Sequence, residues 1–245
     1  MTKGTMSLEG ADGYYTASMS TRELSTIKGL ITDQYLARLS SLSKTEINEF
    51  YLKGMQQYHL LSHMVEHQTL WPKKVRTLGP NAVEQFKELP FFTRLKNSLN
   101  IHSITNEDGS EWEEVYWRIV RPGSTDVGGF HADKWFWDLG HGNIPDGYKR
   151  IKIWIAIEVV KNKSGLSIIP GSHLRHDWKY HGKEDHTGIT KPQFDEDIAK
   201  LNVVDLSTDP GDYVVFNDEL IHAGMPNQSD ETRVSLEATL LVPNL

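Results

Sequence analysis

Apolar residues recur at three- and four-residue intervals in much of the first half of the chain and gather in short runs in the second half. These runs are rich in Val, Ile, Trp and Tyr and are separated by Gly, Pro and Asp, a pattern that predicts β-strands. The predicted strands are residues 113–121, 150–159, 165–169, 201–205, 212–217 and 233–242. Their spacing is typical of a double-sheet jelly-roll barrel rather than of βαβ units.

The first half carries two helix-start signals. Ser20 with Glu23, and Ser43 with Glu46, have the spacing of a capping box, in which a hydroxyl and a carboxylate satisfy the first free N–H groups of a helix. The second box precedes an apolar stripe that predicts one long helix lying on a face of the sheet. The stripe comprises Ile47, Phe50, Tyr51, Met55, Tyr58, Leu61 and Val65. A shorter helix is expected after Pro80.

The 245 residues are expected to form a single domain, mainly β with flanking helices, whose N-terminal helices pack on one sheet. Residues 1–19 are rich in Gly, Ser, Thr and Met without periodicity and predict a flexible arm. Residues 20–112 are expected to be mostly helical support. Residues 113–245 are expected to form the barrel core.

Composition narrows the possible partners. A net charge of −7 argues against binding to nucleic acid or anionic lipid, and no apolar run approaches the length of a membrane span. The chain has no cysteine, so any metal must sit on His, Asp or Glu. We therefore expect a cytoplasmic protein that acts on a small molecule, without nucleic-acid or membrane partners. The pattern carries no signal for oligomeric state.

Three side chains form a candidate metal site. His131 and Asp133 follow a predicted strand and, in extended chain, project to the same side. Such a triplet alone is weak evidence, because 11 His and 33 acidic residues give about 1.5 of them by chance. His222 lies 91 residues downstream, just after another predicted strand that a barrel can bring close. Two imidazoles and one carboxylate leave three octahedral positions open, as is typical of non-haem Fe(II) oxygenases.

Arg233 and Ser235 lie on the last predicted strand and are expected to point the same way. A dicarboxylic cosubstrate that chelates iron with one end requires a fixed cation at its other end. The planar guanidinium suits this role because it bonds a carboxylate through two parallel N–H groups, and Ser can add a hydroxyl. Considered without the three candidate ligands, Arg233 would be interpreted as a surface residue of an edge strand. Together with the three candidate ligands it predicts a carboxylate site.

Three blocks in roughly the last 130 residues resemble the phytanoyl-CoA dioxygenase-like family. They are His131-Ala132-Asp133, the run from Trp154 to Pro170-Gly171-Ser172-His173, and the run from Asp209 through His222 and Asn227 to Arg233. The resemblance implies a double-stranded β-helix, a cupin-like jelly roll, with iron on His131, Asp133 and His222. It further implies 2-oxoglutarate on Arg233 and Trp154 lining the cosubstrate pocket, while Ser235 matches less specifically.

The activity implied by this resemblance is an Fe(II)- and 2-oxoglutarate-dependent dioxygenase that consumes O₂. It would hydroxylate an aliphatic C–H bond of a small polar or anionic metabolite and release succinate and CO₂. Halogenating relatives have a small residue where this chain has Asp133, so hydroxylation is favoured. Desaturation, ring closure and epimerisation stay open, as does the identity of the substrate.

Two segments that interrupt the barrel are expected to select the substrate. Residues 134–146 follow the metal motif and contain Trp135 and Trp137, which either line an apolar pocket or pack the segment down. Residues 174–200 contain His176 and form either a solvated loop or an active-site lid. Basic side chains in this second segment suit an anionic or polar substrate.

Two alternative functions remain at this point. His63, Glu66 and His67 match the H-x-x-E-H pattern of some zinc peptidases, although a helix surface that happens to carry the histidines explains them better. A barrel that binds a ligand without chemistry is the second alternative. It would give no reason for the complete set of His, Asp, Arg and Ser. His173, in a Pro-Gly-Ser-His turn, is expected to be structural rather than a ligand.

Overall fold

Two antiparallel sheets face each other in the computed structural model, which describes residues 8–40, 42–106, 111–142, 144–184 and 188–244. The larger sheet has the strand order β1 (Tyr14–Ser18), β9 (Asp212–Asn217), β4 (Tyr148–Glu158), β11 (Arg233–Pro243) and β2 (Ser103–Ile104), and β3 (Tyr116–Val120) also pairs with β11. The smaller sheet has the order β10 (His222–Gly224), β5 (Leu166–Ile168) and β8 (Val204–Asp205). A separate hairpin joins β6 (Tyr180–Glu184) and β7 (Thr190–Phe194).

Alternation along the strands gives the larger sheet two chemically different faces. On β4, Ile151, Ile153 and Ile155 belong to the apolar layer shared with the helices. Trp154 points the other way and packs with apolar residues of both sheets. Lys152 lies on the same face as Trp154, so polar side chains on this face are directed into the space between the sheets.

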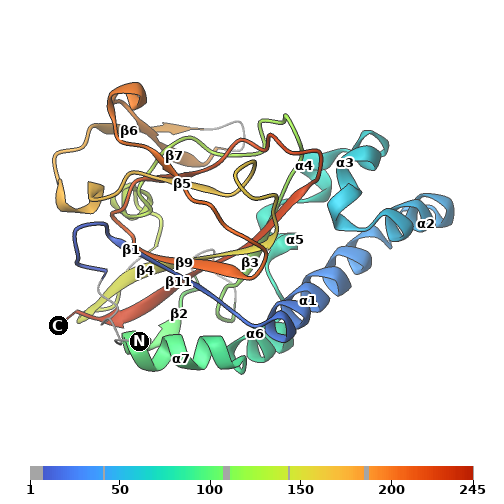
Figure 1. The fold of residues 1–245 in the computed structure, drawn as a ribbon, viewed down its shortest axis with the longest axis horizontal. Coiled ribbons are helices and arrows are strands. Elements are labelled where there is room, and N and C mark those ends of the chain that lie inside the picture. Colours follow the sequence, from blue (N-terminus) through green and yellow to red (C-terminus); the bar gives the residue numbers. More distant parts are fainter. Residues whose placement is uncertain (1–7, 41, 107–110, 143, 185–187, 245) are drawn as a thin grey trace.

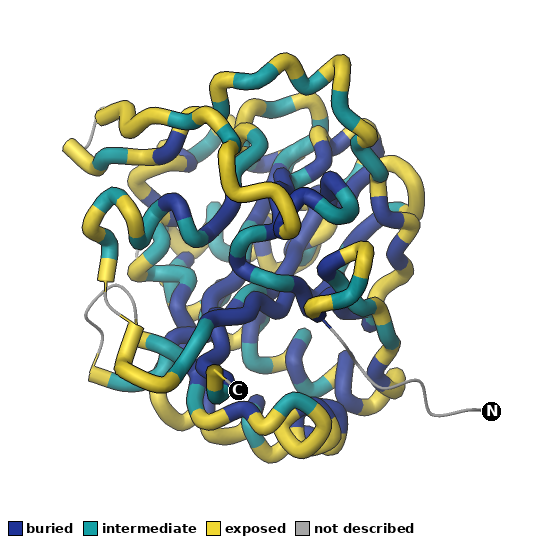
Figure 2. The backbone as a smooth tube through the Cα atoms, turned by 90° about the vertical axis from the view of Figure 1, so that its left-hand side faces the viewer, coloured by how far each residue is buried: buried dark blue, intermediate teal, exposed yellow. Residues whose placement is uncertain are grey.

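Helices cover the outer face of the larger sheet. Figure 1 shows α1 (Thr21–Leu39), α6 (Pro80–Lys87) and α7 (Pro90–Leu99) along this face, with β5, β6 and β7 on the opposite side. The buried chain runs through the middle of the molecule, and exposed residues form its outer turns (Figure 2). Within the described part of the chain, no helix has the length and apolarity that crossing a membrane requires.

Both predicted capping boxes are confirmed. Ser20 and Ser43 each accept from the N–H three residues on, and Glu23 and Glu46 each accept from the backbone N–H of the capping serine. The remaining helical segments are short. They are α2 (Lys44–Lys53), η1 (Met55–Gln57), α3 (Tyr58–Leu61), η2 (Ser62–Met64), α4 (His67–Leu70), α5 (Lys73–Arg76), α8 (Lys134–Asp138), η3 (Ser172–Leu174) and η4 (Ile198–Lys200).

The single long helix predicted from residue 43 to 65 is wrong. The chain leaves the helix at Gly54, whose φ of 67° lies in the region that favours glycine, and continues as short turns. Phe50 and Tyr58 of the apolar stripe are fully buried, whereas Tyr51 is 66% exposed. The stripe therefore identified core residues but not the break between them.

The flexible arm predicted for residues 1–19 is also wrong for its last part, because Tyr14–Ser18 pair with β9 in continuous antiparallel register. Residues 1–7 lie outside the described chain. Strand β1 covers the backbone groups of β9 that would otherwise form an open sheet edge. All six strands predicted from sequence are present, whereas β1, β2, β10 and the β6–β7 hairpin were not predicted.

We expect Ile153→Ala to lower the free energy of unfolding by about 2–5 kcal/mol, because this side chain is 1% exposed between the sheet and the helices. Leu52→Ala is the control, since Leu52 is 77% exposed and should change stability by less than about 0.5 kcal/mol. Urea unfolding of both variants measures the difference. Equal values would contradict this packing.

Candidate metal centre

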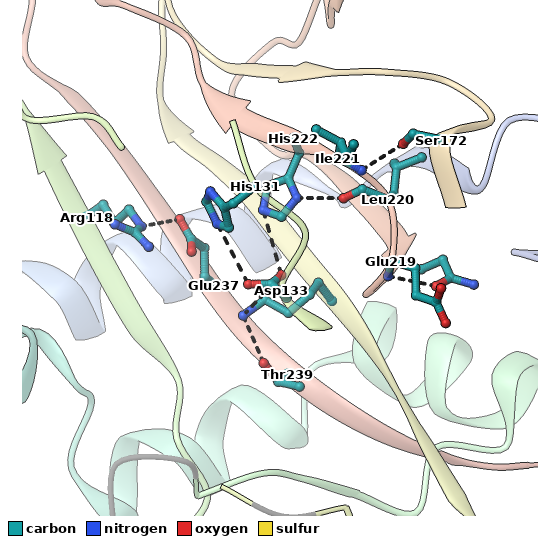
Figure 3. Close-up of polar contacts among 12 residues, drawn as sticks. Arg118, His131, Asp133, Ser172, Glu219, Leu220, Ile221, His222, Glu237 and Thr239 are labelled. Carbon is teal, nitrogen blue, oxygen red and sulfur yellow. Dashed lines mark hydrogen bonds and ion pairs between the residues drawn. The ribbon is translucent and has the colours of Figure 1, made fainter. Parts of the chain in front are cut away.

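A backbone pairing between two distant segments places the two histidines side by side. The His131 N–H donates to the His222 carbonyl at 3.0 Å, and the His222 N–H donates to the His131 carbonyl at 2.9 Å. Asp133 has helical dihedrals and precedes α8 directly, so it does not have the extended conformation assumed from sequence. Its carboxylate nevertheless turns toward both imidazoles (Figure 3).

The three side chains converge on one point. His131 Nε2 lies 3.9 Å from Asp133 Oδ1, and His222 Nε2 lies 3.7 Å from Asp133 Oδ2. All three potential ligand atoms lie within 4.8 Å of one another. Across the described ranges this is the one group of three or more His, Asp or Glu side chains with such an arrangement.

Hydrogen bonds fix the tautomer of both imidazoles. His131 Nδ1 lies 2.8 Å from the Gly129 carbonyl, and His222 Nδ1 lies 3.0 Å from the Leu220 carbonyl. A carbonyl only accepts, so Nδ1 must carry the proton in both rings. The lone pair is then on Nε2, the atom that faces Asp133. Orienting contacts of this kind are usual for metal-binding histidines.

The charges at the site suit a cation. Burial lowers the pKa of His131 to about 4, and repulsion from His222 adds to this effect, so the ring is neutral at pH 7. Burial alone would raise the pKa of Asp133, but Lys152 and the two histidines hold it below its usual value. Asp133 Oδ2 is buried and has no hydrogen-bond donor among the residues that the structure describes. Two imidazoles that present their Nε2 lone pairs, together with an ionised carboxylate, fit a divalent metal of the iron type.

The Pro170–His173 turn supports His222 from behind. Gly171 has a φ of 77°, and Ser172 Oγ accepts a hydrogen bond of 2.8 Å from the Ile221 N–H (Figure 3). The residue before His222 is therefore anchored to the turn. The His173 ring is buried against Gly13 and is not part of the metal-ligand group.

A cavity between the two sheets reaches the three side chains. It holds about 60 Å³ of space for solvent, more than the ~10–15 Å³ that one ordered water requires. Trp154, Lys152 and Arg233 form part of its wall. Five residues named from sequence therefore meet at one cavity: His131, Asp133, Trp154, His222 and Arg233.

Arg233 is a buried cation with capacity to bind a ligand. It is 2% exposed, and its Nη1 donates to the Gly165 carbonyl at 2.6 Å and to the Met225 carbonyl at 3.1 Å. Burial lowers its pKa to about 10, so it stays charged at pH 7. Its Nε and the hydroxyl of the fully buried Ser235 have no protein hydrogen-bond partner among the described residues.

Arg118, Lys152 and Glu237 of the cavity wall were missed by sequence reasoning, as was a fourth charged residue, Asp126. Arg118 Nε donates to Glu237 Oε1 at 2.6 Å, and Lys152 Nζ lies 3.8 Å from Asp133 Oδ2. The first three lie on the inner face of the larger sheet. The available signal was a charged residue at an alternate position within an otherwise apolar strand.

The predicted substrate contacts lie elsewhere, because none of Trp135, Trp137 and His176 lines this cavity. Trp135 is buried and stacks on Tyr180 at 4.4 Å between ring centroids. Arg150 lies over the Trp137 ring at 3.7 Å. The His176 side chain is 74% exposed. Their contact with substrate stays a prediction, and for Trp135 the geometry favours packing of the hairpin.

The zinc-peptidase pattern has no geometric support. His63 lies in a 3₁₀ turn and Val65 is extended, so the helical spacing of the two imidazoles is lost. His67 is 8% exposed and hydrogen-bonds to the Tyr58 hydroxyl at 2.9 Å, so its expected place on a helix surface is wrong. His63, Glu66 and His67 do not form a metal-ligand group in the described structure.

Comparison with known proteins gives one family. The family model described as phytanoyl-CoA dioxygenase (PhyH) matches residues 62–235. No curated protein sequence matches the chain.

Solved structures resemble the fold at low sequence identity. The non-heme monooxygenase ThoJ is 16% identical with a TM-score of 0.57, covering 96% of this chain and 75% of ThoJ. EctD from S. alaskensis, solved with 2-oxoglutarate and 5-hydroxyectoine, is 14% identical with a TM-score of 0.57, covering 99% and 78%. The non-heme alpha ketoglutarate dependent carbocyclase SnoK is 15% identical with a TM-score of 0.51, covering 95% and 80%.

A buried carboxyl beside the site predicts a pH effect. Burial raises the pKa of Asp218 to about 7, and repulsion from Asp133 and Glu219 adds to this effect. The folded state therefore retains a proton that the unfolded chain loses near the ordinary carboxyl pKa of 3.8, so the stabilisation from this group is lost as pH rises from about 4 through about 7.

In metal-free protein, Asp218→Asn should stabilise the fold at pH 8 by about 2–4 kcal/mol and should flatten the pH dependence between about 4 and 7. Thermal melts across this range measure the effect, with the exposed Glu88→Gln as control. Parallel curves for Asp218→Asn and wild type would mean that Asp218 is ionised in the folded protein.

Proposed function

The chain belongs to the phytanoyl-CoA dioxygenase family, and on this basis we propose that it hydroxylates an aliphatic C–H bond of a small polar or anionic metabolite, releasing succinate and CO₂. Family membership makes the protein a non-haem iron oxygenase that uses 2-oxoglutarate. The substrate and the outcome at its carbon atom belong to the proposal.

We assign the iron to His131 Nε2, His222 Nε2 and the Asp133 carboxylate. This assignment depends mainly on the Nδ1–H hydrogen bonds of both histidines to backbone carbonyls. These bonds leave both Nε2 lone pairs directed at Asp133. The carboxylate compensates part of the metal charge. It also fills the position that a halide would need, and this favours hydroxylation over halogenation.

We assign one carboxylate of 2-oxoglutarate to Arg233. The support is a buried guanidinium whose Nε–H has no acceptor in the described part of the chain; the Ser235 hydroxyl, two residues along the same strand, has no partner there either. A carboxylate of the cosubstrate would give the Arg233 Nε–H its acceptor, whereas an unpaired buried donor is costly. Trp154 closes one wall of the same cavity and keeps water from the cosubstrate.

When bound, iron and 2-oxoglutarate supply the oxidising chemistry that activates O₂ and removes a hydrogen atom from the substrate. The chain supplies orientation and shielding. Phe216 packs against His222 at 4.7 Å between ring centroids, and the buried walls exclude water from the reacting atoms. No protein nucleophile is required.

Anaerobic protein should bind one Fe(II) and then 2-oxoglutarate, producing a weak visible charge-transfer band. His131→Ala/His222→Ala should lose the band, because Asp133 alone then remains to hold the metal. His63→Ala should keep it, since His63 lies outside the metal-ligand group. Absorption titration measures each case, and a band that survives the double change would refute the assignment.

Arg233→Ala should raise the apparent KM for 2-oxoglutarate while iron binding persists. Removing one partner of a buried, hydrogen-bonded charge pair costs about 2–5 kcal/mol, so the change should exceed about 30-fold. The apparent KM of Arg233→Lys should lie between those of wild type and Arg233→Ala, because lysine keeps the charge but not the planar guanidinium. Unchanged dependence on 2-oxoglutarate in both variants would assign this role to another cation.

A further inference from the structure

The cavity wall has an unbalanced set of charges. The charged residues on it are Arg118, Lys152, Arg233, Asp126, Asp133 and Glu237. Arg121 neutralises Asp126 from behind through two hydrogen bonds of 2.8 and 2.9 Å. Three cations then face two anions. A dicationic metal and a dianionic cosubstrate cancel each other, so the loaded cavity keeps a net charge of about +1.

Arg118 is the most accessible of these cations. Its side chain is 39% exposed, compared with 5% for the side chain of Lys152 and 2% for Arg233. Of the two buried cations, Lys152 approaches Asp133 and Arg233 is assigned to the cosubstrate. A molecule that enters the cavity after the cosubstrate therefore meets the Arg118 guanidinium.

Arg118 is held in place by the carboxylate of Glu237, whose side chain is 12% exposed. Glu237 Oε1 accepts from Arg118 Nε at 2.6 Å, and Glu237 Oε2 accepts from the Tyr116 hydroxyl at 2.8 Å (Figure 3 shows the Arg118 contact). Burial opposes ionisation of Glu237, but Arg118 and Lys152 lower its pKa to about 2. The Nε edge is thus occupied. Within the described part of the chain, Nη2 has one further contact, to the Tyr116 hydroxyl at 3.4 Å, and Nη1 has none. The guanidinium has N–H groups left to donate.

Along β11, strand register places Arg118 between the level of Arg233 and the level of Thr239, where Lys152 pairs and approaches Asp133. Arg118 pairs with Ser235, and Val120 pairs with Arg233, so Arg118 lies one inward-facing position, ~6.6 Å, further along the sheet than the level of Arg233. Arg118 and His131 line the same cavity. An anion on Arg118 would therefore hold its own carbon chain beside the metal site.

We propose that Arg118, braced by Glu237 and Tyr116, binds a carboxylate of the substrate and so makes the substrate an organic anion. The inference rests on the proposed function, because the count of charges assumes that iron and 2-oxoglutarate occupy the cavity. One carboxylate brings the loaded cavity to neutrality. The fixed guanidinium offers the donor geometry that such a group prefers, at little cost in side-chain ordering.

The test compares butyrate with butyramide, two probes of the same shape that differ in charge. Each is titrated by calorimetry into anaerobic protein loaded with Fe(II) and saturating 2-oxoglutarate, while the charge-transfer band reports that both stay bound. Wild type should bind butyrate about tenfold more tightly than butyramide. Glu237→Gln should keep this preference. The double variant Arg118→Gln/Glu237→Gln differs from Glu237→Gln by the guanidinium alone. It should lose the preference for butyrate, while its affinity for 2-oxoglutarate stays within about twofold of wild type.

Arg94→Gln, an exposed substitution on α7, is the control for a general loss of positive charge and should behave as wild type. Equal binding of the two probes, no binding of butyrate at millimolar concentrations, or a preference that survives the double change would overturn the inference. So would displacement of 2-oxoglutarate by butyrate. Protein that binds neither Fe(II) nor 2-oxoglutarate would refute the proposed function instead.

Discussion

The backbone pairing of His131 with His222 is the constraint on which the site depends. Two reciprocal N–H···O=C bonds join segments that are 91 residues apart and bring both imidazoles to one point. The other groups at the centre orient the side chains that this pairing brings together. The carbonyls of Gly129 and Leu220 select the tautomer, and the helix that begins after Asp133 turns the carboxylate inward. A loss of this pairing would separate the two imidazoles even if each side chain were intact.

Strand alternation connects this centre to the stability of the fold. The outward residues of β4 and β11 form the apolar layer beneath the helices, and their inward residues supply Lys152, Trp154, Arg233 and Glu237 to the cavity. The same two strands therefore carry the core on one face and charges on the other. Burying these charges is tolerated because most of them pair within the cavity wall, and Asp133 and Arg233 retain unsatisfied atoms where ligands are proposed to bind.

Local patterns in the sequence predicted much of this arrangement. Six strands, two capping boxes and the convergence of His131, Asp133 and His222 followed from periodicity, spacing and family motifs. The break at Gly54 was missed because the apolar stripe continues in phase through the turns that follow it. Strand β1 was missed because its pairing with β9 depends on residues about 200 positions away. The Arg118–Glu237 pair was missed for the same reason, since only the register of β3 on β11 brings the two side chains together.

In the proposed enzyme, one iron ion is bound by these three side chains and 2-oxoglutarate lies on Arg233. Anomalous diffraction at the iron edge, from crystals grown anaerobically with Fe(II) and 2-oxoglutarate, measures this most directly. The predicted result is a single strong peak bonded to His131 Nε2, His222 Nε2 and the Asp133 carboxylate, with the far carboxylate of the cosubstrate on the Arg233 guanidinium. An iron peak at any other set of side chains, or a cosubstrate carboxylate held away from Arg233, would contradict it.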